Sequence, residues 1–285
     1  MILIADSGST KTSWRLIDDS KQIHQCATQG FNPYFQSSED LIEILKNEVL
    51  NSFTLINAQL PIRIYYYGAG CGAQAKKQIV AHAFQSIFPK AITEVHTDML
   101  GACRATCGHQ AGIVAILGTG ANTCYYNGKE IIENTPSLGY VLGDEGSGAY
   151  IGKTFVQAYL NNEMPEELSK RFFARFKLGK DEILNVVYTQ PNPNRFLASF
   201  SKFVYQNLKE QFVKDLVAGC FQQFFDKHIC KYKMHKDVKL SCVGSVAYYY
   251  SNILRAVAVN KGVNIDTIIE TPIAGLTLFH ESETV

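Results

Sequence analysis

The residues best suited to chemistry near the start of the chain form one short polar segment between two apolar runs. The segment consists of Asp6, Ser7, Gly8, Ser9, Thr10, Lys11 and Thr12. Small residues let backbone N–H groups approach a phosphate, the threonines and the lysine add donors, and the aspartate can hold Mg²⁺ through water. A hairpin turn uses the same residue types, and the spacing is not that of a P-loop. The segment alone therefore fits either phosphate binding or a plain turn.

A second glycine-rich turn lies near the middle of the chain and also follows an apolar run. Its residues are Gly118, Thr119, Gly120, Ala121 and Asn122. Either turn alone would merely reverse the chain, whereas two such turns facing each other would hold a triphosphate from both sides. The duplication therefore favours nucleotide binding.

The first turn belongs to a run of predicted elements with the order βββαβαβ. The predicted strands span residues 2–5, 12–17, 23–28, 63–67 and 91–96, and the predicted helices span residues 41–50 and 73–88. Ser37 or Ser38 is placed to cap the first helix, and the last strand leads to Asp98 at the start of another helix. This order predicts a mixed sheet covered by helices.

The second turn opens a similar run. Strands are predicted over residues 112–117, 123–127, 129–133, 139–142 and 238–243, and helices over residues 245–260 and 272–280. A long helical tract over residues 148–231 breaks near Pro165, near Gly179 and at Pro191 and Pro193. No Gly/Ser-rich linker separates the two halves, which indicates two closely joined domains.

Composition and charge narrow the class of protein. The 285 residues are 46% hydrophobic and 19% charged, which is typical of a globular protein, and the formal net charge is +1. Such a balanced charge creates no global field for nucleic acid or an anionic membrane. The first residues lack the basic region of a signal peptide, and no run of about 18 apolar residues occurs. A cytoplasmic protein is expected.

The eight cysteines do not form the pattern of a disulfide framework or a zinc site. Cys103 and Cys107 are four residues apart and His109 is near, but no paired CxxC motif accompanies them. We expect reduced thiols on a buried helix and no zinc.

Several of these segments resemble motifs of the actin/hexokinase-like superfamily. Residues 6–12 resemble its first phosphate motif, residues 118–122 its second, and residues 242–246 (Cys-Val-Gly-Ser-Val) its adenosine motif. Residues 142–147 (Leu-Gly-Asp-Glu-Gly-Ser) and 97–99 (Thr-Asp-Met) are similar to N-acetylglucosamine kinases within the BadF/BadG/BcrA/BcrD ATPase family. The resemblance extends from residue 3 to about residue 279.

The resemblance implies an α/β fold of two actin-like ATPase (ribonuclease H-like) domains, each a mixed five-stranded sheet with helices, and a cleft between them. The expected N-terminal domain comprises residues 1–105 and 271–285, and the expected C-terminal domain residues 106–270. It also implies transfer of phosphate from ATP, with Mg²⁺, to a hydroxyl of an amino sugar, most closely N-acetylglucosamine. Dimers are usual among such relatives.

Carried over by position, the resemblance assigns a role to individual residues. Asp98 is the implied catalytic base. The implied sugar-binding residues are Asn32, Gly70, Asp98, Thr119, Gly120, Thr135 and Asp144. The implied ATP-binding residues are Gly8, Ser9, Thr10, Lys11, Thr12, Gly118, Thr119, Gly120, Gly244 and Ser245. Asp6 is the implied Mg²⁺ ligand, through water.

Several of these residues also have simple structural interpretations. Asp98 has the residue type of a helix N-cap, Asp144 and Glu145 precede a helix that either could cap, and Asn32 precedes a proline in a turn. Where the vertebrate kinases have a cysteine and a Gly-Gly-Trp segment, this sequence has Thr135 and residues 136–138 (Pro-Ser-Leu). In the first phosphate motif, Lys11 stands where those kinases have an arginine. The sugar thus stays open among amino sugars, their N-acetyl forms and N-acetylmuramic acid.

Three rival interpretations come from local patterns. Residues 68–73 (Gly-Ala-Gly-Cys-Gly-Ala) fit a dinucleotide-binding turn with Glu94 downstream, although a Rossmann fold normally begins with that turn. The family also includes ATP-hydrolysing activators that act on a protein partner through a cysteine-bound iron–sulfur cluster, but residues 114–117 (Val-Ala-Ile-Leu) lack the expected cysteine. Basic stretches at residues 170–177 and 227–239 are typical of solvated helix faces rather than nucleic-acid sites.

Overall fold

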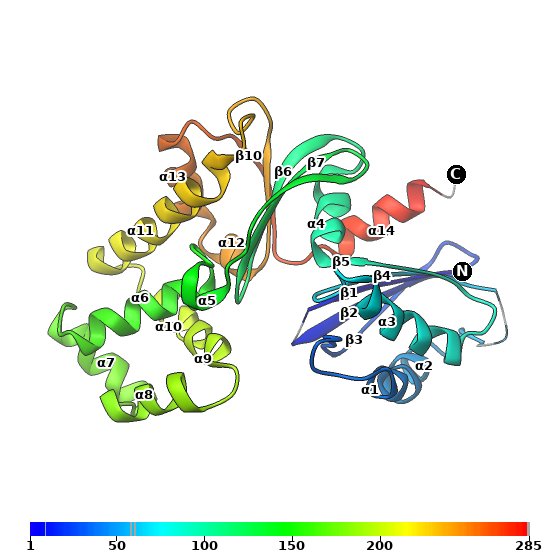
Figure 1. Cartoon of the computed structure of the whole chain (residues 1–285), viewed down its shortest axis with the longest axis horizontal. Helices are drawn as coiled ribbons and strands as arrows, with labels where there is room; N and C mark the ends of the chain where they lie inside the picture. Colours follow the sequence, from blue (N-terminus) through cyan, green and yellow to red (C-terminus); the bar gives the residue numbers. More distant parts are fainter. Residues whose placement is uncertain (9, 58, 60, 284–285) are drawn as a thin grey trace. The chain divides into compact units, whose positions relative to one another are not determined.

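The computed structural model describes residues 1–8, 10–57, 59 and 61–283. The chain divides into two compact units (Figure 1). Unit 1 comprises Met1–His109 and Pro272–Val285, and unit 2 comprises Gln110–Thr271. The C-terminal segment therefore returns to the unit in which the chain begins.

Unit 1 contains a five-stranded mixed sheet. Its strands are β1 (Ile2–Ser7), β2 (Lys11–Ile17), β3 (Ile23–Gln29), β4 (Arg63–Gly68) and β5 (Ile92–Thr97), in the order β3-β2-β1-β4-β5. Strand β2 is antiparallel to its neighbours β1 and β3, whereas β4 and β5 run parallel to β1. Because β2 runs opposite to the other four strands, β1, β3, β4 and β5 all end at the same edge of the sheet.

The two faces of this sheet are covered by different helices. Alternate residues of a strand point to opposite faces, and Leu3 and Ala5 of β1 pack into one hydrophobic cluster while Ile2 and Ile4 pack into another. The first cluster is covered by α1 (Ser38–Ile44), a π-helical turn at Leu45–Val49, α2 (Leu50–Ser52) and α3 (Gln74–Ile87), and the second face carries α4 (Asp98–Cys107) and α14 (Ile273–Ser282). Ser37 caps α1 through a capping box with Asp40.

Unit 2 contains a second five-stranded mixed sheet with the order β10-β9-β6-β7-β8. Its strands are β6 (Ala111–Leu117), β7 (Ala121–Asn127), β8 (Ile131–Thr135), β9 (Leu240–Val243) and β10 (Ile265–Ile269). Here β6, β7 and β8 are antiparallel neighbours, and β9 and β10 run parallel to β6. The strands β6, β8, β9 and β10 therefore end at one edge, as the corresponding strands do in unit 1.

Helices account for most of the rest of unit 2. They are α5 (Gly139–Leu142), α6 (Gly148–Leu160), α7 (Glu166–Phe176), α8 (Lys180–Thr189), α9 (Pro193–Ser199), α10 (Ser201–Gln206), α11 (Gln211–Lys227), a 3₁₀ turn at Ile229–Lys231, α12 (Ser245–Tyr249) and α13 (Ser251–Asn260). Pro165 and Gly179 occupy the N-cap positions of α7 and α8, and Pro193 begins α9. These helix starts agree with the breaks predicted in the long helical tract.

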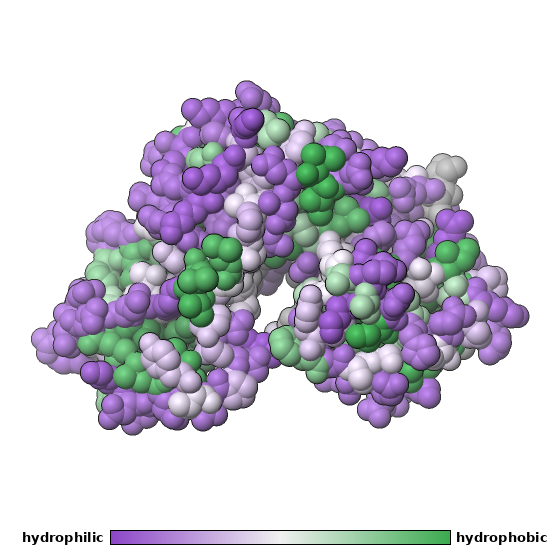
Figure 2. All heavy atoms as spheres, viewed as in Figure 1, coloured by the Kyte–Doolittle hydropathy of each residue, from purple (hydrophilic) through white to green (hydrophobic). Residues whose placement is uncertain are grey.

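One prediction about the second sheet is wrong, and one strand was missed. Residues 139–142 form the single helical turn α5, closed by a hydrogen bond of 2.8 Å from Gly143 N–H to Gly139 O, and not a strand. Val141 and Leu142 are 66% and 74% exposed, and Figure 2 shows hydrophobic side chains at the surface where α5 lies in Figure 1. The apolar run was therefore no sign of a buried strand. The fifth strand is instead β10, which the sequence analysis missed.

The cysteines and the helices show no special chemistry in the described part of the chain. The eight cysteines are free thiols, and Cys103 is buried on α4. Among the described residues, no group of three or more His, Cys, Asp or Glu side chains is placed to hold a metal ion. Nor does the described part contain a helix long and apolar enough to span a membrane.

Candidate functional site

In unit 1, the predicted site residues gather at the edge where four strands end. Gly8 follows β1, Asn32 follows β3, Gly70 follows β4, and Asp98 follows β5. Because these strands share one direction, their carboxyl ends place the four residues along a single edge of the sheet. This is the edge at which open α/β sheets bind ligands.

The described residues of the first polar segment include the end of β1 and the start of β2. Gly8 N–H donates to Lys11 O at 3.0 Å, and Gly30 N–H donates to Thr10 O at 3.0 Å. A Cβ at Gly30 would lie 2.3 Å from Gly8 O, so only glycine lets the end of β3 support the turn this closely. Ser9 lies outside the described residues.

The side chains of this turn divide into two groups. Thr12 is 1% exposed, and its hydroxyl is 2.8 Å from that of Ser7, so it serves the packing of the turn. Thr10 and Lys11 are exposed. Among the described residues of this turn, Thr10 and Lys11 thus carry side-chain donors that are accessible.

Asp6 and Asp98 are the two acidic groups of this edge. Asp6 lies near the end of β1, and burial together with the negative charge of Asp98 raises the pKa of Asp6 to about 7. Burial also raises the pKa of Asp98, although its Oδ1 accepts a hydrogen bond of 2.9 Å from Met99 N–H. The N-cap of α4 is Thr97, whose hydroxyl accepts from Leu100 N–H at 3.2 Å, so Asp98 is not needed as the cap.

Asn32 and Gly70 lie against each other. Gly70 has a φ of +80°, and a Cβ there would lie 2.6 Å from Asn32 Oδ1, which accepts a hydrogen bond from Tyr34 N–H. Lys76 of α3 donates to Pro33 O at 2.8 Å and lies over the Tyr34 ring. The loop that carries Asn32 is therefore anchored to α3.

In unit 2, the glycine turn between β6 and β7 is held by the start of α6. Gly118 N–H donates to Gly120 O at 3.0 Å, which closes the turn. The N–H groups of Gly148 and Ala149 donate to Gly118 O and Thr119 O at 2.8 and 3.0 Å. The first turn of α6 thus fixes the carbonyls of the glycine turn.

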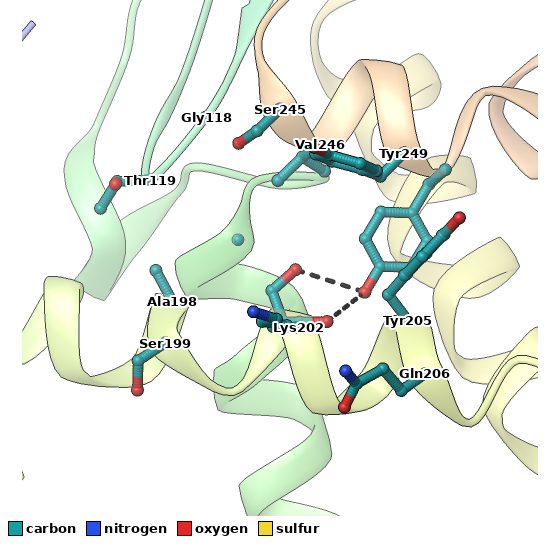
Figure 3. Close-up of a pocket in the computed structure, with 13 residues that line it drawn as sticks. Gly118, Thr119, Ala198, Ser199, Lys202, Tyr205, Gln206, Ser245, Val246 and Tyr249 are labelled. Atoms are coloured by element: carbon teal, nitrogen blue, oxygen red, sulfur yellow. Dashed lines mark hydrogen bonds between the residues drawn. The ribbon is translucent and has the colours of Figure 1, made fainter. Parts of the chain in front are cut away.

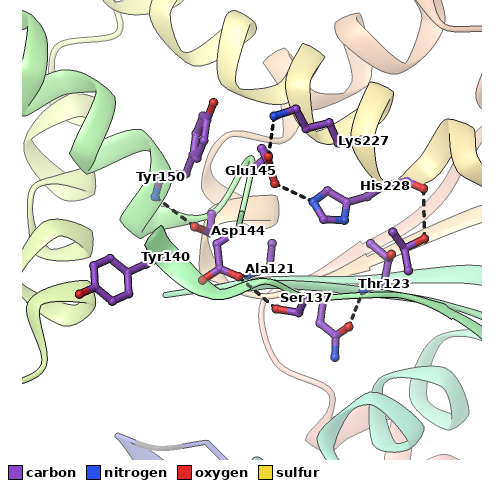
Figure 4. A network of polar contacts seen from close by, with 12 residues as sticks. Ala121, Thr123, Ser137, Tyr140, Asp144, Glu145, Tyr150, Lys227 and His228 are labelled. Atoms are coloured by element: carbon purple, nitrogen blue, oxygen red, sulfur yellow. Dashed lines mark hydrogen bonds and ion pairs between the residues drawn. The ribbon is translucent and has the colours of Figure 1, made fainter. Parts of the chain in front are cut away.

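Asp144 lies beside this turn, as Figure 4 shows. Its Oδ1 accepts from Ala121 N–H at 3.3 Å and from the Ser137 hydroxyl at 3.2 Å, while its Oδ2 is 3.0 Å from where a Cβ of Gly120 would lie. Asp144 is 7% exposed, and burial raises its pKa. The cap of α6 is Ser147, which accepts from Tyr150 N–H, so neither Asp144 nor Glu145 is the cap.

Thr135 ends β8 close to the same network. Its N–H donates to the Tyr232 hydroxyl at 2.9 Å, and its own hydroxyl points to His228 O at 3.5 Å. No role was predicted for Ser137, His228 or Tyr232. His228 is the C-cap residue of α11 and Tyr232 follows the 3₁₀ turn after it, whereas Ser137 lies between β8 and α5. No local pattern marked any of the three.

A cavity of about 490 Å³ lies within unit 2 (Figure 3). It is lined by Gly118, Thr119, Gly148, Ala198, Ser199, Ser201, Lys202, Tyr205, Gln206, Ser245, Val246, Tyr249 and Tyr250. The predicted ATP-binding residues Gly118, Thr119 and Ser245 are therefore brought together at one cavity. The wall from α9 and α10 was not predicted.

Gly244 supports this cavity without lining it. Its φ is +118°, and a Cβ there would lie 2.3 Å from Leu117 O. The residue thus lets the end of β9 approach the end of β6 closely. Tyr250, which follows α12, donates to Ser201 O of α10 at 2.6 Å, and both residues line the cavity.

Comparison with known proteins adds a decisive observation. The sequence profile of the BadF/BadG/BcrA/BcrD ATPase family matches residues 5–275. The chain belongs to this family. Membership in the BadF/BadG/BcrA/BcrD ATPase family implies that the protein uses ATP. A search of proteins with curated functions gave no significant match.

Solved structures confirm the predicted fold class of this BadF-family chain. A protein of Porphyromonas gingivalis, provisionally named an N-acetylglucosamine kinase, is 39% identical with a TM-score of 0.92, and each chain is fully covered. A Chromobacterium violaceum protein with the same provisional name has 14% identity, a TM-score of 0.73 and 98% coverage of each chain. A Streptomyces griseus glucokinase in complex with glucose and AMPPNP has 13% identity, a TM-score of 0.57 and 98% coverage of each chain.

Proposed function

We propose that this protein is an ATP-dependent kinase that phosphorylates a hydroxyl of an amino sugar, with N-acetylglucosamine as the first candidate. The observation that carries the proposal is the full-length similarity, at 39% identity, to the Porphyromonas gingivalis protein that bears the name of such a kinase. The chemistry of the described residues supports it, because each unit carries a different part of what a kinase needs.

In unit 2, we assign the adenosine of ATP to the cavity. Its aromatic wall, formed by Tyr205 and Tyr249, offers apolar surface for a base, and Lys202 and Gln206 add polar groups. Gly118 and Thr119 form another part of the lining, so phosphates that extend from the cavity would meet the backbone of the glycine turn. The cavity volume suits a ligand of nucleotide size.

In unit 1, we assign Mg²⁺ to Asp6. Its carboxylate is held beside the negative charge of Asp98, with its pKa raised to about 7, and a bound cation would offset that unfavourable arrangement. Mg²⁺ in kinases is commonly held by one or two carboxylates together with waters and phosphate oxygens, which suits a site with so few protein ligands. When bound, Mg²⁺ neutralises charge on the transferred phosphate.

Asp98 is the proposed base. An ionised carboxylate whose pKa has been raised by burial is a stronger proton acceptor than an exposed one. In the proposed step, the sugar hydroxyl oxygen bonds to the γ-phosphorus, its proton passes to Asp98, and the bond to the leaving ADP oxygen breaks. Asn32, Gly70, Thr135 and Asp144 are proposed to bind the sugar.

The proposal is tested by ADP release from Mg-ATP with a panel of sugars. The panel comprises N-acetylglucosamine, glucosamine, N-acetylmuramic acid, N-acetylmannosamine and glucose, with a sample that lacks sugar. We expect release to depend on one amino sugar. Equal release in every sample would contradict the proposal and would favour an ATPase that acts on a protein partner, as the BadF-type activators do.

A further inference from the structure

A buried ionic group lies directly beside Asp144. Glu145 is 4% exposed, and both oxygens of its carboxylate have partners at the end of α11. Lys227 Nζ is 2.9 Å from Oε1, and His228 Nε2 is 2.9 Å from Oε2 (Figure 4). Burial alone would raise the pKa of Glu145, but the hydrogen bonds from Lys227 and His228 hold it below its usual value. The carboxylate is therefore charged.

A contribution to folding stability does not by itself explain why Glu145, Lys227 and His228 form a buried ionic group. Removing a charge from water is costly, and buried ion pairs are often replaced by apolar residues without loss of stability. Lys227 is half-exposed, but Glu145 and His228 are both nearly inaccessible. His228 Nδ1 has no hydrogen-bond partner among the described residues, so in the described part of the chain Nε2 alone holds the ring through a side-chain hydrogen bond.

The group connects the two segments that carry proposed sugar-binding residues of unit 2. Asp144 precedes Glu145 and has a left-handed φ of +57°, a conformation that is uncommon outside glycine although aspartate adopts it more readily than most residues. On the other side, the His228 carbonyl faces the Thr135 hydroxyl at the end of β8. A shift of α11 would thus be felt at both Asp144 and Thr135.

The group is also separate from the nucleotide cavity. None of Glu145, Lys227 and His228 is among the residues that line it. The group therefore adjoins the segments that carry Asp144 and Thr135 and lies outside the lining of the cavity proposed for adenosine.

We propose that Glu145 and His228 are positioning residues for sugar binding: their contact fixes Asp144 and the end of β8 in the arrangement that holds the sugar. This inference rests on the proposed sugar kinase activity. The two residues touch neither the phosphate nor the transferred proton in this account, and they act through Asp144 and Thr135.

A matched pair of substitutions at position 228 tests the contact. In His228→Gln, the side-chain amide nitrogen replaces Nε2 and still donates to Glu145, whereas in His228→Asn the amide corresponds to Nδ1 and falls short of Glu145. We expect His228→Asn to raise the KM for the sugar about tenfold or more, the effect of losing a hydrogen bond to a charged group. His228→Gln should stay within about threefold of the natural protein, and the KM for ATP should change in neither.

Further variants keep the test decisive. Glu145→Gln, which preserves shape but removes the charge, should give the same rise in the sugar KM and serves if His228→Asn does not fold. Lys170→Met removes a surface ion pair with Glu166 on α7 and is the control. Equal sugar KM values for the two His228 variants, or parallel changes in both KM values, would overturn the inference. Absence of sugar-dependent turnover in the natural protein would instead overturn the proposed function, and the inference with it.

Discussion

Replacing Asp6 with asparagine should stabilise the fold while removing activity. Burial and the neighbouring charge of Asp98 raise the pKa of Asp6 from its usual 3.8 to about 7. The folded protein therefore holds this proton at pH values where the unfolded chain has lost it. The resulting stabilisation is fully present below pH 3.8 and is lost as the pH rises through about 7. An asparagine cannot ionise, so the Asp6→Asn variant avoids the cost of a buried negative charge at every pH.

The size of the effect follows from the difference in pKa. Each pKa unit corresponds to about 1.4 kcal/mol, so the difference between 3.8 and about 7 gives about 4 kcal/mol above pH 8. Local rearrangement around the amide offsets part of this, and we expect a gain of about 2–4 kcal/mol at pH 8. Near pH 4 the difference should fall to about 0.6 kcal/mol or less, because Asp6 is then protonated in the folded state and about two-fifths protonated in the unfolded state.

Urea unfolding without nucleotide or Mg²⁺, repeated from pH 4 to pH 8.5, measures this difference. The control is Glu43→Gln, which removes an exposed carboxyl group on α1 of the same unit. The free-energy difference between Asp6→Asn and the natural protein should grow with pH, and the control should not reproduce it. A constant difference, or an Asp6→Asn variant that is less stable at pH 8, would refute the reasoning about Asp6.

Three further substitutions, the last with a matched control, give separate expectations. Asp98→Asn should lower kcat by about 100- to 10,000-fold without weakening nucleotide binding by titration, and a loss of both would show a structural role. Asp144→Ala should raise the sugar KM about tenfold with an unchanged KM for ATP, and an unchanged sugar KM would remove Asp144 from the sugar site. Gly244→Ala should weaken ATP binding and lower the melting temperature, because the added Cβ would lie 2.3 Å from Leu117 O. The control Gly219→Ala, on α11, places its Cβ with no atom within 4 Å and should raise the melting temperature.

The sequence predicted those parts of the fold that depend on local signals. Glycine and proline marked the starts of α7, α8 and α9, and Ser37 marked the start of α1. The strand β10 was missed because Ile265–Ile269 alternates poorly and lies at the edge of its sheet, where little of it is buried. Residues 139–142 were mistaken for a strand because an apolar run was equated with burial, although Val141 and Leu142 are exposed.

The same division applies to the candidate site. Gly30, Gly70 and Gly244 are positions where the backbone or a neighbouring side chain leaves no room for a Cβ, and such constraints leave glycines in the sequence. No such sequence signal marks the cavity wall on α10 or the contact of Glu145 with His228. They arise from packing between segments far apart in the chain: Glu145 and His228 are 83 positions apart, and no sequence pattern links them.

The proposed reaction transfers phosphate from ATP to a sugar. Phosphorus NMR of a reaction with Mg-ATP and N-acetylglucosamine, run beside the Asp98→Asn variant, tests it most directly. We expect a phosphate monoester signal of the sugar that grows together with ADP in the natural protein and is absent in the variant. Formation of ADP and inorganic phosphate without any phosphorylated sugar, across the whole panel of sugars, would contradict it.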